Sequence, residues 1–283
     1  MGARGPRGGG AGPSPPWGAG RTIGLAVGGK RLVNTLGVLR FVLAGKRAHF
    51  RRYYTNSSAL SYPVPPPASL LGLMGAALGL GPEYGQALEG VFLAVRPLGR
   101  HRALMQTMSH LFLKRGGLEE LRGLHPDGRT QIPIQMLVAE GGGSIRYEVW
   151  VASEDKALIW RLRGALEDPH YPLSLGPAFA LAWVEELEEK EGLLKKTWKG
   201  KGIGWWRVGC LVNWSRTSET KLYRDRFPVL LSADRTPLCF EELVLELEGK
   251  PIEVDYRDWV LVLGENEGIG GLFITSKQDG TCM

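Results

Sequence analysis

Long apolar runs are absent from this sequence. The longest candidate, residues 68–80, is shorter than the ~18 residues that a membrane-spanning helix needs, so we read it as a core helix. The N-terminus also lacks the apolar segment of a secretory signal. We therefore expect a cytoplasmic protein with no membrane partner.

Cysteine and metal-ligand patterns are scarce as well. The three cysteines, Cys210, Cys239 and Cys282, are odd in number and have no CxxC spacing, which argues against a disulfide framework and a zinc site. The sequence has no Walker loop, no Ser-His-Asp order and no paired-carboxylate metal cluster. We expect neither a cofactor nor a metal.

Acidic residues are missing from the first 82 positions. Ten of the 35 Lys and Arg lie there, so the rest of the chain has 25 basic and 29 acidic residues. The excess positive charge therefore belongs to the front of the chain. Basic clusters neutralise phosphates, and this pattern favours a nucleic-acid partner.

Two further basic stretches follow. Residues 96–118 hold five basic residues and no acid, and residues 195–226 hold nine basic residues against two acids, with four of the nine tryptophans. Interleaved aromatic rings are surfaces on which unstacked bases can lie. The later stretch is equally compatible with solvated loops whose tryptophans belong to the core.

Residues 1–36 begin with a Gly/Pro/Arg tract that has no apolar periodicity, which predicts a disordered basic tail. Beyond it, the pattern predicts strands over 38–44, 91–96 and 177–184, a helix over 68–80, and a hairpin of 132–139 with 144–152 around three glycines. It also predicts a helix capped by Ser153 that runs to Leu166, and a charged helix over 185–191.

This order of elements is βαββαβ, which predicts an α+β protein with a ferredoxin-like (RRM-type) domain over 37–190. A polar, basic excursion over about 97–131 interrupts the domain between its second and third strands. Residues 191–283 alternate short strands and turns, and we expect a smaller β-rich C-terminal region there.

The loop after the first strand has the composition of a single-stranded RNA site. It combines two guanidiniums with three aromatic rings and a histidine, namely His49, Phe50, Arg51, Arg52, Tyr53 and Tyr54. Recognition of unpaired RNA needs phosphate donors and stacking surfaces of this kind. The excursion adds Arg100, His101, Arg102, Lys114 and Arg115. An ordinary solvated turn is the alternative for the loop.

Several segments resemble one protein family. They are a Gly-X-X-Ala-X-Phe turn (Gly45, Ala48, Phe50), the run SYPVPPPASLLGLMGAALGL, the strand VFLAVR and the turn from Tyr171 to Gly176. Together they resemble the family-five CRISPR-associated proteins of the RAMP superfamily, over about residues 37–185. Among these, the chain looks most similar to subunits of the type I surveillance complex, Cascade.

The resemblance implies a role in antiviral defence within a multisubunit complex. Such a subunit binds the 5′ handle of the crRNA and caps the backbone beside the large subunit, and the complex recognises target DNA. The resemblance also implies that residues 97–131 are a "thumb" laid over RNA. Six large apolar residues among the thumb arginines suggest an arm that docks on a neighbour, or else a helix covering the protein's own sheet.

One branch of the same family cleaves precursor crRNA without a metal, using a tyrosine at the position of Tyr62 and a Lys-His pair. This chain has no Lys-His dipeptide, and we read Tyr62 as a packing residue. Three hypotheses remain open: a non-catalytic RNA-binding subunit, which we favour; a metal-independent endoribonuclease of the same fold; and an RRM-like module unconnected with CRISPR.

Overall fold

The computed structural model describes residues 35–56, 58–111, 118–123, 129–214, 220–264 and 267–274. The expected tail over 1–36 falls almost entirely outside these residues. Within them, no helix is long and apolar enough to cross a membrane.

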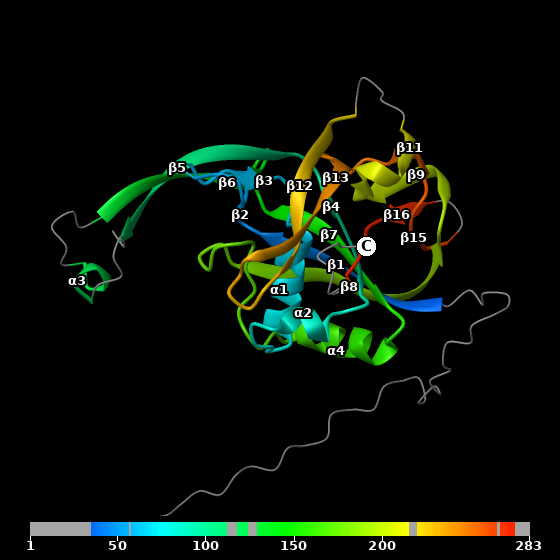
Figure 1. Ribbon diagram of the computed structural model, residues 1–283, viewed down its shortest axis with the longest axis horizontal. Helices are drawn as coiled ribbons and strands as arrows, with labels where there is room; N and C mark the ends of the chain where they lie inside the picture. The colour runs from blue at the N-terminus through cyan, green and yellow to red at the C-terminus, as the bar shows by residue number, and fades with distance from the viewer. Residues whose placement is uncertain are drawn as a thin grey trace, which may run out of the picture. The chain divides into compact units, whose positions relative to one another are not determined.

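Strands dominate the described residues (Figure 1). In chain order they are β1 (Thr35–Gly45), β2 (Phe50–Arg51), β3 (Ser61–Tyr62), β4 (Phe92–Pro97), β5 (His101–Leu111), β6 (Arg129–Ala139), β7 (Ile145–Ser153), β8 (Ala182–Lys195), β9 (Trp198–Gly204), β10 (Trp206–Arg207), β11 (Leu211–Trp214), β12 (Leu222–Leu231), β13 (Pro237–Glu246), β14 (Ile252–Tyr256), β15 (Val260–Val262), β16 (Gly268–Gly270) and β17 (Leu272–Phe273). The helices are α1 (Pro67–Ala77), α2 (Tyr84–Ala87), α3 (Leu118–Leu121), α4 (Lys156–Glu167) and the 3₁₀ turn η1 (Val208–Cys210).

Four strands form the centre of the main sheet in the order β8-β1-β7-β4, with every neighbouring pair antiparallel. Helix α1 lies between β1 and β4 in the chain, and α4 lies between β7 and β8. This is the connectivity of a ferredoxin-like βαββαβ unit. The protein is a β-rich α+β protein, as the sequence pattern predicts.

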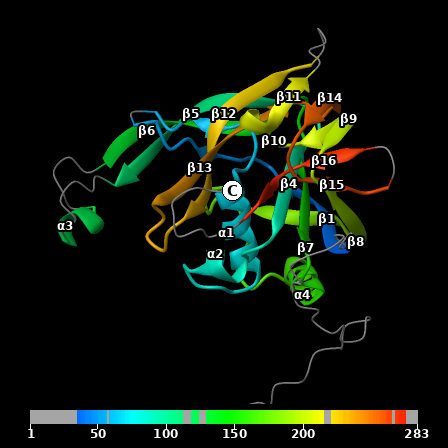
Figure 2. The same cartoon turned by 45° about the vertical axis from the view of Figure 1, so that its right-hand side comes forward.

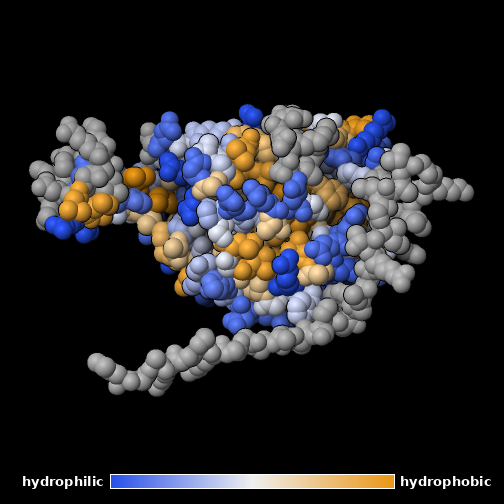
Figure 3. Space-filling view, turned by 60° about the horizontal axis from the view of Figure 1, so that its bottom comes forward, coloured by the Kyte–Doolittle hydropathy of each residue, from blue (hydrophilic) through white to orange (hydrophobic). Residues whose placement is uncertain are grey.

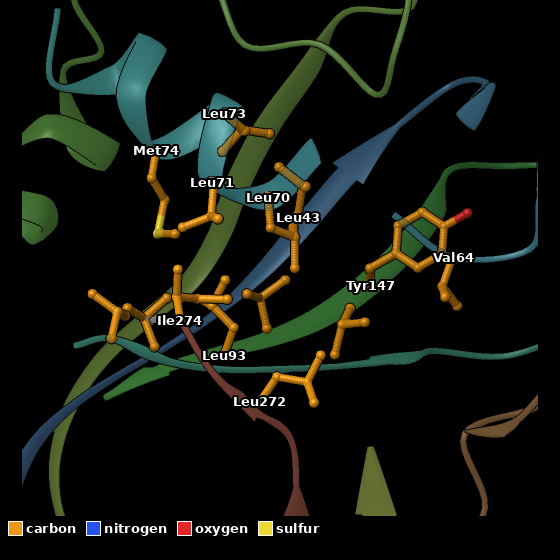
Figure 4. Close-up of a cluster of buried hydrophobic side chains, with 14 of the residues drawn as sticks. Leu43, Val64, Leu70, Leu71, Leu73, Met74, Leu93, Tyr147, Leu272 and Ile274 are labelled. Carbon is orange, nitrogen blue, oxygen red and sulfur yellow. The ribbon is translucent and has the colours of Figure 1, made fainter. Parts of the chain in front are cut away.

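One face of this sheet carries the core (Figure 4). Leu39, Phe41 and Leu43 of β1 alternate with residues of the other face and pack against α1 and α4. The small residues of α1 let it lie close to the sheet, and Pro67 opens the helix without the loss of a hydrogen bond. The hairpin of β12 and β13 adds Phe227, Val229, Leu243 and Leu245 to the same core.

The other face is partly enclosed by the end of the chain. The main sheet continues from β8 through β15 and β16, and β17 pairs with β4 at the opposite edge. Only Gly271 separates β16 from β17 in the chain. The strands β16, β15, β8, β1, β7, β4 and β17 therefore form a closed ring. Its interior holds nine buried residues: Leu36, Val38, Phe92, Ala94, Trp150, Ala152, Ile203, Leu261 and Ile269.

Three sequence predictions about local structure are wrong, and the strand expected over 177–184 begins only at Ala182. Residues 185–191 form part of β8, because pairing with β1 overrides the helix propensity of EELEEKE. Strand β6 pairs with β5 and not with β7, so the three glycines join two different sheets. The cap of α4 also differs: Asp155 accepts the hydrogen bonds from Ala157 and Leu158.

The excursion is a hairpin of β5 and β6, and α3 lies between its strands in the chain. We call these residues the thumb hairpin. Both views show it extending away from the sheet (Figure 2). Most of β5 is exposed, including Leu104 (40%) and Met105 (57%). The alternative of a helix covering the protein's own sheet is therefore wrong.

The turn at Gly176 generates the first prediction. Gly176 has a φ of 102°, and a Cβ there would lie 1.8 Å from the backbone oxygen of His49. Gly176→Ala should therefore destabilise the protein by about 1–3 kcal/mol more than a change at an open site with a similar backbone. Urea unfolding measures the difference.

Gly143→Ala is the matched control, because Gly143 also has a positive φ of 85° but nothing within 4 Å of its Cβ position. Equal losses of stability in the two variants would show that the close approach to His49 is unimportant.

Candidate RNA-binding surface

The sheet face that RRM-type domains use for bases is occupied here. Beyond the ring interior, this face carries Arg40 and Arg96, whose Nε atoms donate to the two carboxylate oxygens of buried Glu148 at 2.5 and 2.6 Å. Arg40 also reaches Glu186 and Glu188 of β8. RRM proteins stack bases on aromatic residues of an open sheet, and this paired surface offers no such platform.

The loop after β1 begins with two buried residues. His49 is 6% exposed and its Nδ1 lies 2.9 Å from the backbone oxygen of Gln135, while burial lowers its pKa. Phe50 is 3% exposed and meets Tyr147 edge-on, with ring centroids 5.9 Å apart. These two predicted site residues anchor the loop, and we leave them out of the candidate surface.

The tip of the loop is exposed. Arg51 lies at the surface and donates to the backbone oxygen of Thr55. Tyr53 and Tyr54 are 42% and 47% exposed and meet edge-on at 5.1 Å. One cation beside two open rings is an arrangement suited to a phosphate and a neighbouring base.

Arg52 belongs to a network that holds the loop in place. Its Nε donates to the backbone oxygen of Ser61, and its guanidinium carbon lies 5.9 and 5.6 Å from the ring centres of Tyr62 and Tyr223. It also forms an ion pair with Asp225 at 3.7 Å. Arg52 is therefore mainly a positioning residue for the tyrosines beside it.

Asp225 of β12 joins the loop to the C-terminal hairpin. Its carboxylate accepts hydrogen bonds from the hydroxyls of Tyr54, at 2.8 Å, and Tyr223. Tyr53 packs on Phe240 of β13, with ring centroids 4.2 Å apart. The β12–β13 hairpin therefore supports the loop along its length.

Tyr62, the only candidate for a catalytic role, is fully buried. Its hydroxyl donates to the backbone oxygen of Arg226 at 2.7 Å, and its ring stacks on Phe227 at 4.6 Å. Burial raises the pKa of the phenol. A general base needs a reachable, readily deprotonated oxygen, and Tyr62 offers neither property.

A second cationic group lies where the thumb hairpin leaves the body. Arg100, Lys221 and Lys250 all contact the carboxylate of Glu248, at 2.9, 2.9 and 3.0 Å. The three cations remain about half exposed, and the carboxylate of buried Glu246 accepts hydrogen bonds from the backbone amides of Lys221 and Lys250. Hydrogen bonds from Lys221 and Lys250 lower the pKa of Glu248 to about 2.

The other predicted thumb residues differ in their surroundings. Arg102 is exposed on β5, whereas His101 packs edge-on against Tyr147 at 5.0 Å. Burial lowers the pKa of His101 to about 4, which keeps its ring neutral at physiological pH. Lys114 and Arg115 lie outside the described residues.

The basic stretch over 195–226 divides into parts. Trp205 and Trp206 are fully buried core residues, and Trp206 lies against Gly202 and Gly270. Lys199 and Lys201 pair in register with Asp255 and Glu253 of β14. The cations of the stretch that reach the loop and the thumb base are those near β12.

Four residues of this surface escaped sequence reasoning. Lys221 and Arg226 lie in the basic stretch 195–226, whose composition is equally compatible with a solvated loop. No sequence pattern near Phe240 or Lys250 indicates RNA binding. Their proximity to the loop and the thumb depends on β12 and β13 folding back across α1. Among the described residues, no group of three or more His, Cys, Asp or Glu side chains gathers as metal ligands do.

The fold and this surface define a ferredoxin-like α+β protein with a thumb hairpin. The sequence family described as CRISPR-associated protein (Cas5) matches residues 38–211, more than half of the chain. The chain therefore belongs to the Cas5 family of CRISPR-associated proteins.

The chain is also similar to several solved structures. A CRISPR protein from Archaeoglobus fulgidus has 10% identity and a TM-score of 0.51, with 82% of this chain and 97% of that chain covered. A structure described as a Cas protein has 16% identity and a TM-score of 0.40, covering 78% and 95%. A chain of a CRISPR RNA-guided surveillance complex has 14% identity and a TM-score of 0.46, covering 77% and 91%. No curated protein matches the sequence significantly.

The position of Tyr62 leads to the second prediction. Tyr62→Phe leaves the Arg226 carbonyl without its donor, so the free energy of unfolding should fall by about 1–3 kcal/mol. When precursor crRNA is incubated in EDTA with the wild type or with Tyr62→Phe, the two proteins should give the same result, whether cleavage or no cleavage. Tyr171→Phe, at a ring that is 51% exposed, is the control for stability. Cleavage that Tyr62→Phe abolishes in a folded protein would contradict the packing role.

The third prediction concerns His101. Because its pKa is lowered to about 4 in the folded state, the unfolded chain binds a proton more readily between pH 6.5 and 4. Stability should therefore fall as the pH decreases through this range, by up to ~3 kcal/mol from this one group. His101→Phe keeps the ring against Tyr147 and removes that contribution. Urea midpoints measured between pH 7 and 4.5 should fall less steeply in the variant, and an unchanged slope would refute the assignment.

Proposed function

We propose that the protein is an RNA-binding subunit of a type I CRISPR surveillance complex, Cascade, in which it holds the 5′ handle of the crRNA and caps the backbone beside the large subunit. Membership of the Cas5 family supports this proposal and excludes the hypothesis of a module unconnected with CRISPR. The complex, and not this chain alone, recognises target DNA.

The observation that carries the proposal is the exposed loop tip. Arg51, Tyr53 and Tyr54 present one guanidinium and two open rings on a loop that Arg52 and Asp225 hold in place. A fixed platform binds a flexible single strand with less loss of loop entropy than a mobile loop does. The surface suits an unpaired RNA end better than a duplex, whose bases are not accessible for stacking.

The thumb hairpin supports a place in a multisubunit assembly. Leu104, Met105 and Leu111 are 40–57% exposed on β5, beside the exposed Arg102. Apolar surface is visible on this arm in Figure 3. Single chains seldom expose long apolar arms, so we propose that neighbouring subunits and RNA cover this one.

The alternative of a metal-independent endoribonuclease has weaker support. Such an enzyme needs an accessible base, a proton donor and a cation at the phosphate. Tyr62 is buried with its hydroxyl engaged, His49 is buried, and the ring of His101 is packed against Tyr147. We therefore propose a non-catalytic role.

The fourth prediction tests RNA binding directly. Arg51→Ala/Arg102→Ala removes one exposed cation from the loop and one from the thumb hairpin. If each contacts a phosphate, the slope of log K against log salt should shrink by about 1.4 for single-stranded RNA, ~0.7 for each contact. Filter binding of the host's repeat RNA at several salt concentrations gives this slope.

The control is Arg161→Ala/Arg257→Ala, which removes two exposed arginines elsewhere on the described surface. It should bind RNA with the wild-type slope. Equal slopes for all three proteins would place the RNA away from the loop and the thumb hairpin.

A further inference from the structure

Both candidate RNA-binding patches contact the same hairpin, β12–β13, which lies in the C-terminal third of the chain. The loop tip meets it at Asp225 and Phe240, and the base of the thumb hairpin meets it through Glu248, two residues after β13 ends. The hairpin therefore bridges two patches that the sequence places about 50 residues apart.

The outer face of the hairpin continues the aromatic surface of the loop. Phe240 lies under Tyr53, and the guanidinium carbon of Arg226 lies 4.8 Å from the centre of the Phe240 ring. Arg226 is exposed, and Phe240 is partly exposed. Arg226, Phe240 and Tyr53 thus form one continuous stack, and an RNA base can extend this stack.

The group of Arg100, Lys221 and Lys250 around Glu248 has the chemistry of a phosphate site. Single ion pairs at a surface stabilise a fold little. Three half-exposed cations instead gather here around Glu248, above the carboxylate of buried Glu246. A phosphodiester is the anion that such a group can bind without displacing Glu248.

The aromatic surface near Arg226 and the cationic group around Glu248 lie at two points along β12. Lys221 directly precedes β12 and Arg226 is its fifth residue, so about 17 Å of extended strand separates their backbones. Arg224 lies between them on the same face as Arg226, paired with Glu242 across the hairpin. A few nucleotides of unpaired RNA span this distance.

We propose that the β12–β13 hairpin binds single-stranded RNA, with a base on Tyr53 and Phe240, Arg226 beside them, and a phosphate on Arg100, Lys221 and Lys250 at the start of β12. The inference rests on the proposed function and adds to it a second RNA-contacting element from outside the ferredoxin-like unit. The RNA runs along β12 between the loop tip and the base of the thumb hairpin.

The fifth prediction uses the full chain and the host's repeat RNA as a single strand, with 5-iodouridine at successive positions. Photocrosslinking of the wild-type protein followed by mass spectrometry should identify Tyr53 or Phe240 as attachment sites. Phe240→Leu keeps an apolar side chain but removes the ring, and should weaken binding by about fivefold or more. Phe240→Tyr should retain wild-type affinity.

The phosphate site is tested by Lys221→Gln/Lys250→Gln, whose salt slope should shrink by about 1.4. Lys199→Gln/Lys201→Gln removes the same charge from β9, where the lysines face Asp255 and Glu253, and is the matched control. Thermal melting checks that each variant remains folded.

Each outcome bears on a distinct claim. Crosslinks on the hairpin and a smaller slope for Lys221→Gln/Lys250→Gln support the inference. If Arg51→Ala/Arg102→Ala weakens binding while the hairpin variants behave as wild type and no crosslink reaches the hairpin, the inference is overturned and the proposed function stands. A wild-type chain that binds no RNA overturns both.

Discussion

The pairing of β1 with β7 on one side and β8 on the other is the constraint on which the rest of the structure depends. Leu39, Phe41 and Leu43 of β1 lie in the helix-side core and Leu36 and Val38 in the ring interior, and Thr35 is the one exposed residue of the strand. Its end at Gly45 determines where the candidate RNA-binding loop begins. Its pairing with β8 also decides that an acidic segment becomes a strand, because the main sheet must continue into the C-terminal strands.

Closure of the ring has a consequence for RNA binding. In an ordinary RRM-type domain the sheet face is open, and aromatic residues on it stack with bases. Here the end of the chain covers part of that face, and the group of Arg40, Arg96 and Glu148 neutralises another part. Positive charge and exposed rings are found instead on the loop, the thumb hairpin and the β12–β13 hairpin. The fold has thus moved the candidate RNA surface from the sheet to its attached elements.

Local patterns predicted the elements whose own residues determine them. The prolines before α1 exclude a helix or a central strand, and the small residues after them favour a closely packed helix. The sequence pattern also predicted strands β4 and β7. The prediction of a hairpin around the three glycines was wrong. A turn signal indicates that the chain reverses, but it does not indicate which strands pair afterwards.

The candidate site divides in the same way. Composition identified a loop of arginines and aromatic rings, but it could not separate exposed Tyr53 and Tyr54 from buried Phe50, because burial depends on contacts with Tyr147, far along the chain. The sequence by itself determined the family, the helices α1 and α4 and the strands β1, β4 and β7 of the ferredoxin-like unit, and the sign of the charge on the candidate surface. Only the tertiary structure decided that Tyr62 is locked against Arg226 and that Phe240, Lys221 and Lys250 join the surface. The contacts of Tyr62 with Arg226, of Tyr53 with Phe240 and of Arg100 with Glu248 link residues more than 100 positions apart, and no local pattern encodes a contact of that range.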